Sequence, residues 1–147
     1  MDWKSAIATF GNTGRMLILG GRRLVMPNKT PFKFAVVSDL HVDNSSQGSQ
    51  NDFNNALTKI VMNGAERVFC CGDIVTNASS SNFQYFTSTL AQHPGVKFAS
   101  CKGNHDYSLD GQVWCDGVKC DSPNYTVEAG GCVFVMMSID TSSNNVS

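Results

Sequence analysis

Three short apolar runs, each followed at once by residues that can bind a metal or move a proton, constrain this chain most strongly. The runs span 34–37, 68–71 and 96–99. After them come, in order, Asp39-Leu40-His41, Gly72-Asp73 and Gly103-Asn104-His105-Asp106. Short continuous apolar runs are typical of strands buried on both faces of a sheet. Because open α/β sheets keep their ligands at the carboxyl ends of the strands, we expect the three polar groups to meet at one sheet edge.

The segments between the runs have the spacing of amphipathic helices. One helix is predicted to begin near Asn51 or Asp52 and to stop at Gly64. A second is expected to be capped by the serine run 79–81 and to end before Pro94. The order strand, helix, strand, helix, strand predicts an α/β fold with a parallel sheet and right-handed crossovers. The expected strands are 33–38, 67–71 and 96–101.

Two hairpins are expected outside this unit. The runs 125–128 and 132–138 flank Gly130-Gly131, which predicts an antiparallel pair with a tight turn. Residues 1–31 are interpreted as an amino-terminal extension with its own β-hairpin, in which the turn is Gly20-Gly21. Residues 32–147 then form the main domain.

The order of the polar groups resembles that of the calcineurin-like metallophosphoesterases, whose motifs run D-x-H, then G-D, then G-N-H-D or G-N-H-E. Here 34 residues separate Asp39 from Asp73, and 31 separate Asp73 from Asn104. The resemblance covers about residues 33–140 and implies that 32–147 are an incomplete domain of this family. It implies a parallel β-α-β-α-β sheet followed by an antiparallel hairpin, as part of a four-layer α-β-β-α sandwich.

The resemblance also implies a site for two divalent metal ions, with Mn, Fe or Zn favoured by oxygen and imidazole ligands. By resemblance Asp39 and His41 bind the first ion, Asp73 bridges both, and Asn104 binds the second. Two cations about 4 Å apart provide a nucleophile near neutral pH and neutralise charge on the attacking and leaving oxygens.

The same motif assigns catalytic roles to its last two residues. His105 resembles the family histidine that stabilises the phosphoryl oxygens or protonates the leaving group, for which a pKa near 6.5 is suitable. Asp106 is expected to hold the other ring nitrogen of His105 and so to fix the orientation of the ring.

One departure from the family is plain in the sequence. No histidine follows His105, whereas family members supply further ligands from a later histidine and from a G-H-x-H motif. Three explanations stay open: an amino-terminal fragment of a phosphoesterase, which we favour, completion of the site by another chain, or a degenerate scaffold that serves as a non-catalytic binding or assembly module. An uncovered sheet face and free hairpin edges also predict self-association.

Charge and hydropathy narrow the partners and the compartment. The formal net charge is −1 with 16% charged residues, which disfavours a nucleic-acid partner bound through a broad basic field. The strings Ser38-Asp39-Leu40-His41 and Gly72-Asp73-Ile74-Val75 resemble the small-molecule phosphodiesterase and phosphatase branches of the family. This resemblance implies a small-molecule phosphate ester as the substrate, including the cyclic-nucleotide type. No apolar run reaches the length of a membrane span and no signal peptide is recognisable at the start, so a cytoplasmic protein is expected.

Six cysteines fit the same interpretation. Cys70, Cys71, Cys101 and Cys132 lie in or beside expected strands and are interpreted as small core residues. Cys115 and Cys120 could close a loop disulfide or bind a metal, but reduced thiols are favoured in a cytosolic protein.

Overall fold

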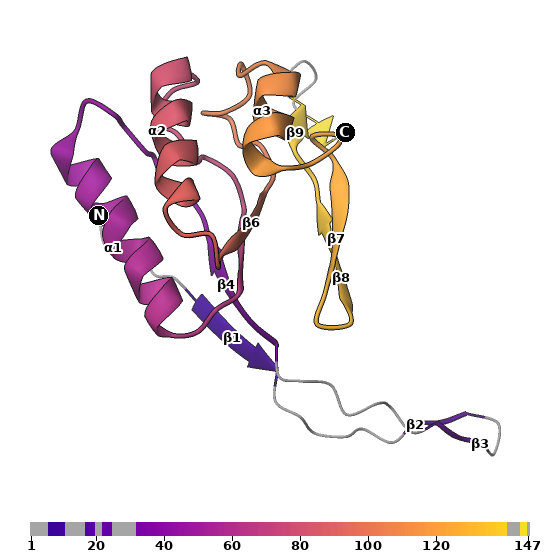
Figure 1. The fold of residues 1–147 in the computed structure, drawn as a ribbon. Coiled ribbons are helices and arrows are strands. Elements are labelled where there is room, and N and C mark those ends of the chain that lie inside the picture. The colour runs from indigo at the N-terminus through magenta and orange to yellow at the C-terminus, as the bar shows by residue number, and fades with distance from the viewer. Residues whose placement is uncertain (1–5, 11–16, 20–21, 25–31, 141–144, 147) are drawn as a thin grey trace.

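A four-stranded sheet forms the centre of the chain. The computed structural model describes residues 6–10, 17–19, 22–24, 32–140 and 145–146. The sheet has the order β1 (Ala6–Phe10), β4 (Phe32–Val37), β5 (Arg67–Cys70) and β6 (Lys97–Ser100). β4, β5 and β6 are parallel, as predicted, with Val37 opposite Cys70 and Cys70 opposite Ser100. β1 pairs antiparallel with β4 and is a fourth strand that the sequence did not indicate (Figure 1).

Two helices connect the parallel strands and cover one face of the sheet. α1 (Gln47–Met62) begins after Ser46, whose side chain accepts a hydrogen bond from the Ser49 N–H. The prediction of a start near Asn51 was therefore wrong, because a serine cap lies one turn earlier. α2 (Ser80–Ala91) is capped by Ser79, as expected, through a hydrogen bond from the Asn82 N–H. The buried faces of both helices pack on the sheet residues Ala35, Val68 and Cys70.

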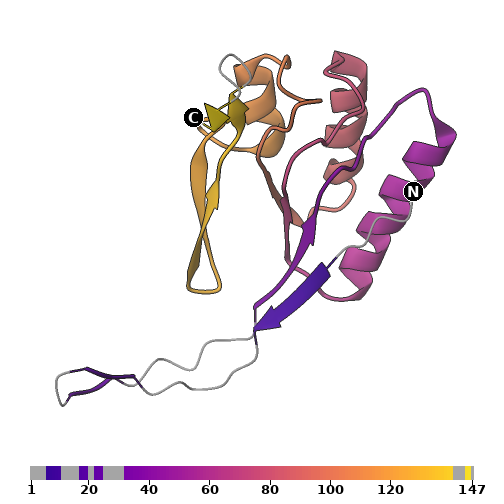
Figure 2. The same cartoon turned by 180° about the vertical axis from the view of Figure 1, so that it is seen from behind.

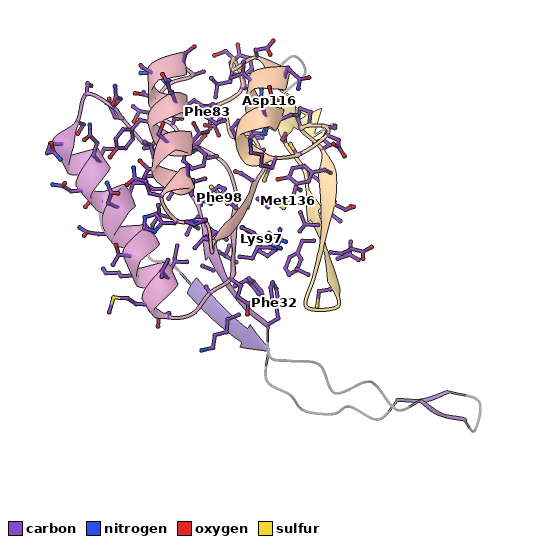
Figure 3. All side chains as sticks on the ribbon, in the orientation of Figure 1. Phe32, Phe83, Lys97, Phe98, Asp116 and Met136 are labelled. Atoms are coloured by element: carbon purple, nitrogen blue, oxygen red, sulfur yellow. The ribbon has the colours of Figure 1, made fainter. Side chains whose placement is uncertain are left out.

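A third helix, α3 (Gly111–Val118), was not predicted. The side chain of Asp110 accepts hydrogen bonds from the N–H groups of Gln112 and Val113 and so caps its first turn. Trp114 is fully buried and stacks on Phe83 of α2 with 5.5 Å between the ring centroids. Figure 3 labels Phe83 where α2 faces α3.

The opposite face of the sheet is covered by the predicted hairpin, β7 (Tyr125–Ala129) and β8 (Cys132–Met136). Gly130 and Gly131 both have positive φ angles, 57° and 75°, which suits the tight turn. Phe134 stacks on Phe69 of β5 at 4.0 Å, and Met136 is buried in the same cluster (Figure 3). Figure 2 shows the hairpin on one side of the sheet and α1 and α2 on the other. The predicted α/β fold, with a parallel sheet followed by an antiparallel hairpin, is confirmed.

Two short ribbons complete the described chain. β2 (Leu17–Leu19) pairs with β3 (Arg22–Leu24) in antiparallel fashion. The expected Gly20-Gly21 turn between them lies outside the described residues. β9 (Ile139–Asp140) pairs with β10 (Asn145–Val146). Among the described residues, no helix combines the length and the apolar character needed to cross a membrane.

The cysteines divide by burial. All six are free thiols, and Cys70 and Cys115 are buried as core residues. Cys71 and Cys132 are exposed, which corrects their interpretation as core residues. Cys71 lies just beyond the end of β5, and Cys132 is the first residue of β8, beside the hairpin turn. Both positions are at the ends of strands.

Candidate metal centre

The segments that follow β4 and β5 run side by side beyond the sheet. The Asp39 N–H donates to the Gly72 carbonyl oxygen at 3.1 Å, and the His41 N–H donates to the Asp73 carbonyl oxygen at 3.0 Å. Further on, Val42 and Val75 form a parallel bridge. The parallel pairing of the strands thus continues into their loops and places the two predicted motifs next to each other.

The backbone is strained at three of the predicted metal ligands. Asp39, His41 and Asp73 have φ angles of 54°, 44° and 53°, in the left-handed region that residues with a Cβ rarely adopt. Each such residue costs on the order of 1–2 kcal/mol. Strain of this kind persists where surrounding contacts hold it, and it gathers at functional sites. Three of the four non-glycine residues with positive φ in the described part of the chain lie on this one sheet edge, which makes it the candidate functional edge.

Side chains from all three strand ends converge here. One potential ligand atom from each of His41, Asp73 and His105 lies within 4.8 Å of those of the other two. The Asp39 Oδ1 atom lies 3.9 Å from His41 Nε2. The rings of His41 and His105 meet edge to face with 4.7 Å between their centroids. One carboxylate and two imidazoles within this distance fit a divalent first-row metal ion, so the residues present suit the group that the sequence implies.

The loop after β6, which carries Gly103 and His105, packs directly on Asp73. The His105 N–H donates to Asp73 Oδ1 at 2.9 Å. A Cβ atom on Gly103 would overlap the same carboxylate and the Asp73 backbone nitrogen. A Cβ on Gly72 would lie 2.9 Å from the Gly103 Cα atom. Glycine is therefore required at both positions, because the loops approach each other more closely than any side chain permits.

The ring of His105 is oriented by a backbone carbonyl. Its Nδ1 atom lies 2.6 Å from the Thr76 carbonyl oxygen. Since a carbonyl oxygen only accepts, Nδ1 carries the proton, and Nε2 is left to bind a metal ion or to exchange a proton. We expected Asp106 to hold this ring nitrogen, and the structure gives that role to Thr76 instead.

Asp106 has a different position and different partners. It is fully buried, and its two carboxylate oxygens accept hydrogen bonds from the backbone N–H groups of Ile74, Val75 and Gly103 at 3.0–3.1 Å. Burial raises the pKa of this carboxyl, while the three N–H donors lower it. Asp106 therefore joins the loop after β5 to the loop after β6 from below the surface.

Four of the six predicted site residues are thus brought together: Asp39, His41, Asp73 and His105. Asn104 lies between Gly103 and His105 in the same turn, and it is exposed. Thr76 is the residue that sequence reasoning missed. Its position three residues after Asp73 was the available signal, but a backbone carbonyl leaves no trace in residue type.

The fold and the clustered side chains together define a candidate metal centre at the carboxyl edge of a parallel sheet, where the D-x-H, G-D and G-N-H-D motifs meet. The family model described as "Calcineurin-like phosphoesterase" matches residues 32–141, and the chain belongs to that family. No curated protein matches the sequence. Among solved structures, the Pseudomonas putida nuclease MPE is similar, with a TM-score of 0.44 and 18% identity over 65% of this chain and 53% of the nuclease. This chain thus spans about half the length of that enzyme.

Proposed function

We propose that this chain carries the centre of a metal-dependent phosphoesterase that hydrolyses phosphomonoesters or phosphodiesters. The convergence of His41, Asp73 and His105 at one sheet edge is the observation that supports the proposal most strongly. Membership of the calcineurin-like phosphoesterase family supports the same reaction class.

We propose a dinuclear site with the ligand roles that the motifs suggest. Asp39 and His41 would bind one ion, Asp73 would bridge two, and Asn104 would bind the second. When bound, a pair of divalent ions such as Mn, Fe or Zn supplies a nucleophile at neutral pH and neutralises developing charge. The left-handed backbone at Asp39, His41 and Asp73 supports the proposal, because strained conformations of this kind gather at functional sites.

His105 is proposed to act on the phosphate. With Nδ1 donating to Thr76, a second proton on Nε2 would let the ring donate to a phosphoryl oxygen or to the leaving group. Its Nε2 could instead serve as a ligand in the same cluster. Replacing His105 with Ala, which has no ligand atom, separates the two: an acid loses turnover and keeps metal affinity, whereas a ligand loses both.

The proposed substrate is a small phosphate ester, since the net charge of −1 offers no field for a polyanion. A second candidate function is a non-catalytic binding or assembly module. It is favoured by the cluster of His41, Asp73 and His105, because three ligands suffice to hold one ion in a binding module without a second ion for turnover.

The test is turnover of an aryl phosphate and of a bis-aryl phosphate by the purified chain with Mn²⁺, beside Asp73→Asn. We expect weak, Mn²⁺-dependent turnover that Asp73→Asn abolishes, because the proposed bridging carboxylate is lost. Asp116→Asn is the matched control: Asp116 is exposed on α3, outside the cluster, and its change should leave the rate intact. Mn²⁺ binding without turnover of either ester would favour the module instead.

A further inference from the structure

The main chain of His41 is held by two hydroxyl groups. His41 has a φ angle of 44°, the smallest positive φ of the three strained site residues. Its carbonyl oxygen accepts one hydrogen bond from Thr76 Oγ1 at 2.8 Å and another from Ser49 Oγ at 2.9 Å. A carbonyl oxygen has two lone pairs, so both are used. These bonds fix the peptide that follows His41 and thereby the direction of its side chain.

Thr76 contacts the second histidine as well. Its own carbonyl oxygen lies 2.6 Å from His105 Nδ1, and its N–H donates to the Val42 carbonyl oxygen at 3.2 Å. Thr76 therefore holds the main chain of His41 and the imidazole ring of His105. The centroids of the two rings are 4.7 Å apart. A shift of either ring therefore changes the distance between the ring nitrogens that could bind a metal ion.

We propose that Thr76 is a positioning residue of this centre, and that its hydroxyl, assisted by that of Ser49, holds His41 in its strained conformation and sets its geometry relative to His105. The proposal rests on the proposed metal-dependent function. In this proposal Thr76 acts through its hydrogen bonds to the two histidines. Partners of metal-binding histidines typically change metal affinity about 10- to 100-fold when they are removed.

The decisive comparison is Thr76→Val with Thr76→Ser. Valine keeps the shape and the backbone carbonyl and removes only the hydroxyl, whereas serine keeps the hydroxyl. Thr58→Val is the matched control, because Thr58 Oγ1 donates to the Asn54 carbonyl oxygen on the exposed side of α1, away from the site. Ser49→Ala removes the other hydroxyl and provides an independent variant if Thr76→Val does not fold.

Two readouts are needed on the 147-residue chain. The first is the Mn²⁺ dissociation constant, obtained by electron paramagnetic resonance titration. The second is the hydrogen-exchange rate of the His41 N–H, which donates to the Asp73 carbonyl oxygen and reports how firmly the main chain of His41 as a whole is held. We expect Thr76→Val to raise the dissociation constant about 10-fold or more and to accelerate His41 exchange about 10-fold. Thr76→Ser should stay within about threefold of the parent in both, and Thr58→Val should match the parent.

The outcomes separate the inference from the proposed function. Unchanged exchange at His41 in folded Thr76→Val, or in Ser49→Ala if valine does not fold, overturns the inference. So does a serine variant as impaired as the valine variant. If the parent chain binds no Mn²⁺, the proposed function fails while the exchange comparison still decides whether the hydroxyls hold His41. Faster exchange with unchanged Mn²⁺ affinity overturns the claim that this geometry serves the metal centre.

Discussion

At the scale of single residues, Asp106 explains why a carboxylate follows the histidine of the third motif. Its two oxygens pair with three backbone N–H groups from two loops in a site without solvent access. We predict that Asp106→Asn lowers the free energy of unfolding by about 1–3 kcal/mol, because an amide NH₂ would face an N–H donor and leave it unpaired. Urea denaturation would measure the change. Asp121→Asn, an exposed change of the same kind, should have little effect, and an equal loss in both variants would contradict the account.

Gly103 has no room for a side chain. An added Cβ would overlap Asp73, so Gly103→Ala must displace either the Asp73 carboxylate or the loop. We expect destabilisation of about 1–3 kcal/mol, typical of overpacking, together with loss of Mn²⁺ binding. Gly95→Ala is the matched control, because a Cβ at Gly95 has no atom within 4 Å. Calorimetric titration with Mn²⁺ would compare the two, and normal binding by Gly103→Ala would mean that the loops are not packed as described.

Residue types indicated the candidate metal ligands, but they did not indicate which groups hold those ligands in place. Asp39, His41, Asp73 and His105 follow predicted strands, and adjacency at one edge follows from parallel pairing alone. The roles of Asp106 and Thr76 depend on backbone N–H and carbonyl groups about 30 positions away. Any residue type supplies such groups, so no sequence pattern marks them.

At the scale of elements, Tyr125 joins the hairpin to the free edge of β6. Its hydroxyl accepts from the Ser100 N–H at 2.9 Å and donates to the Ser100 carbonyl oxygen at 3.0 Å. We predict that Tyr125→Phe lowers the free energy of unfolding by about 1–2 kcal/mol at pH 8, because both edge groups lose their partner. Tyr107→Phe, at an exposed position, should be nearly neutral in the same denaturation experiment.

The Tyr125 hydroxyl also makes the free energy of unfolding depend on pH. Burial raises the pKa of Tyr125 from 10.0 to about 12. The folded chain therefore keeps the phenol proton between about pH 10 and 12, where the unfolded chain releases it. Its stabilising contribution is complete below pH 10 and is lost as the pH rises to 12. We expect the stability gap between the parent and Tyr125→Phe to narrow over this window; a constant gap would contradict the assignment.

Elements with strong local signals were predicted, and those set by distant partners were not. Apolar runs gave β4, β5 and β6, and the serine run gave the start of α2. α3 was not predicted because its eight residues include two glycines, which weaken the helical pattern. Its burial depends on the packing of Trp114 against α2. β1 is defined by its pairing with a strand 22 positions further on, which no local pattern encodes.

At the scale of the whole molecule, β8 and the residues after it present an apolar stripe on the side facing away from the sheet. Val133 and Val135 are 63% and 64% exposed, while Phe134 and Met136 on the other side pack on the sheet. Met137 and Ile139 continue the exposed stripe. We predict concentration-dependent association of the chain, which sedimentation velocity would detect and which Val133→Thr with Val135→Thr should weaken. A strictly monomeric parent at high concentration would contradict the prediction.

The loops after β4, β5 and β6 are proposed to form one site for divalent metal. Substoichiometric Mn²⁺ added to the ¹⁵N-labelled chain tests it directly, because the ion broadens amide signals of the nearest residues. We predict selective loss of signals from residues 39–42, 72–76 and 103–106, with Asp73→Asn suppressing the effect in all three segments together. Broadening confined to other carboxylates, such as Asp52 or Asp116, or the same pattern in Asp73→Asn, would contradict the account.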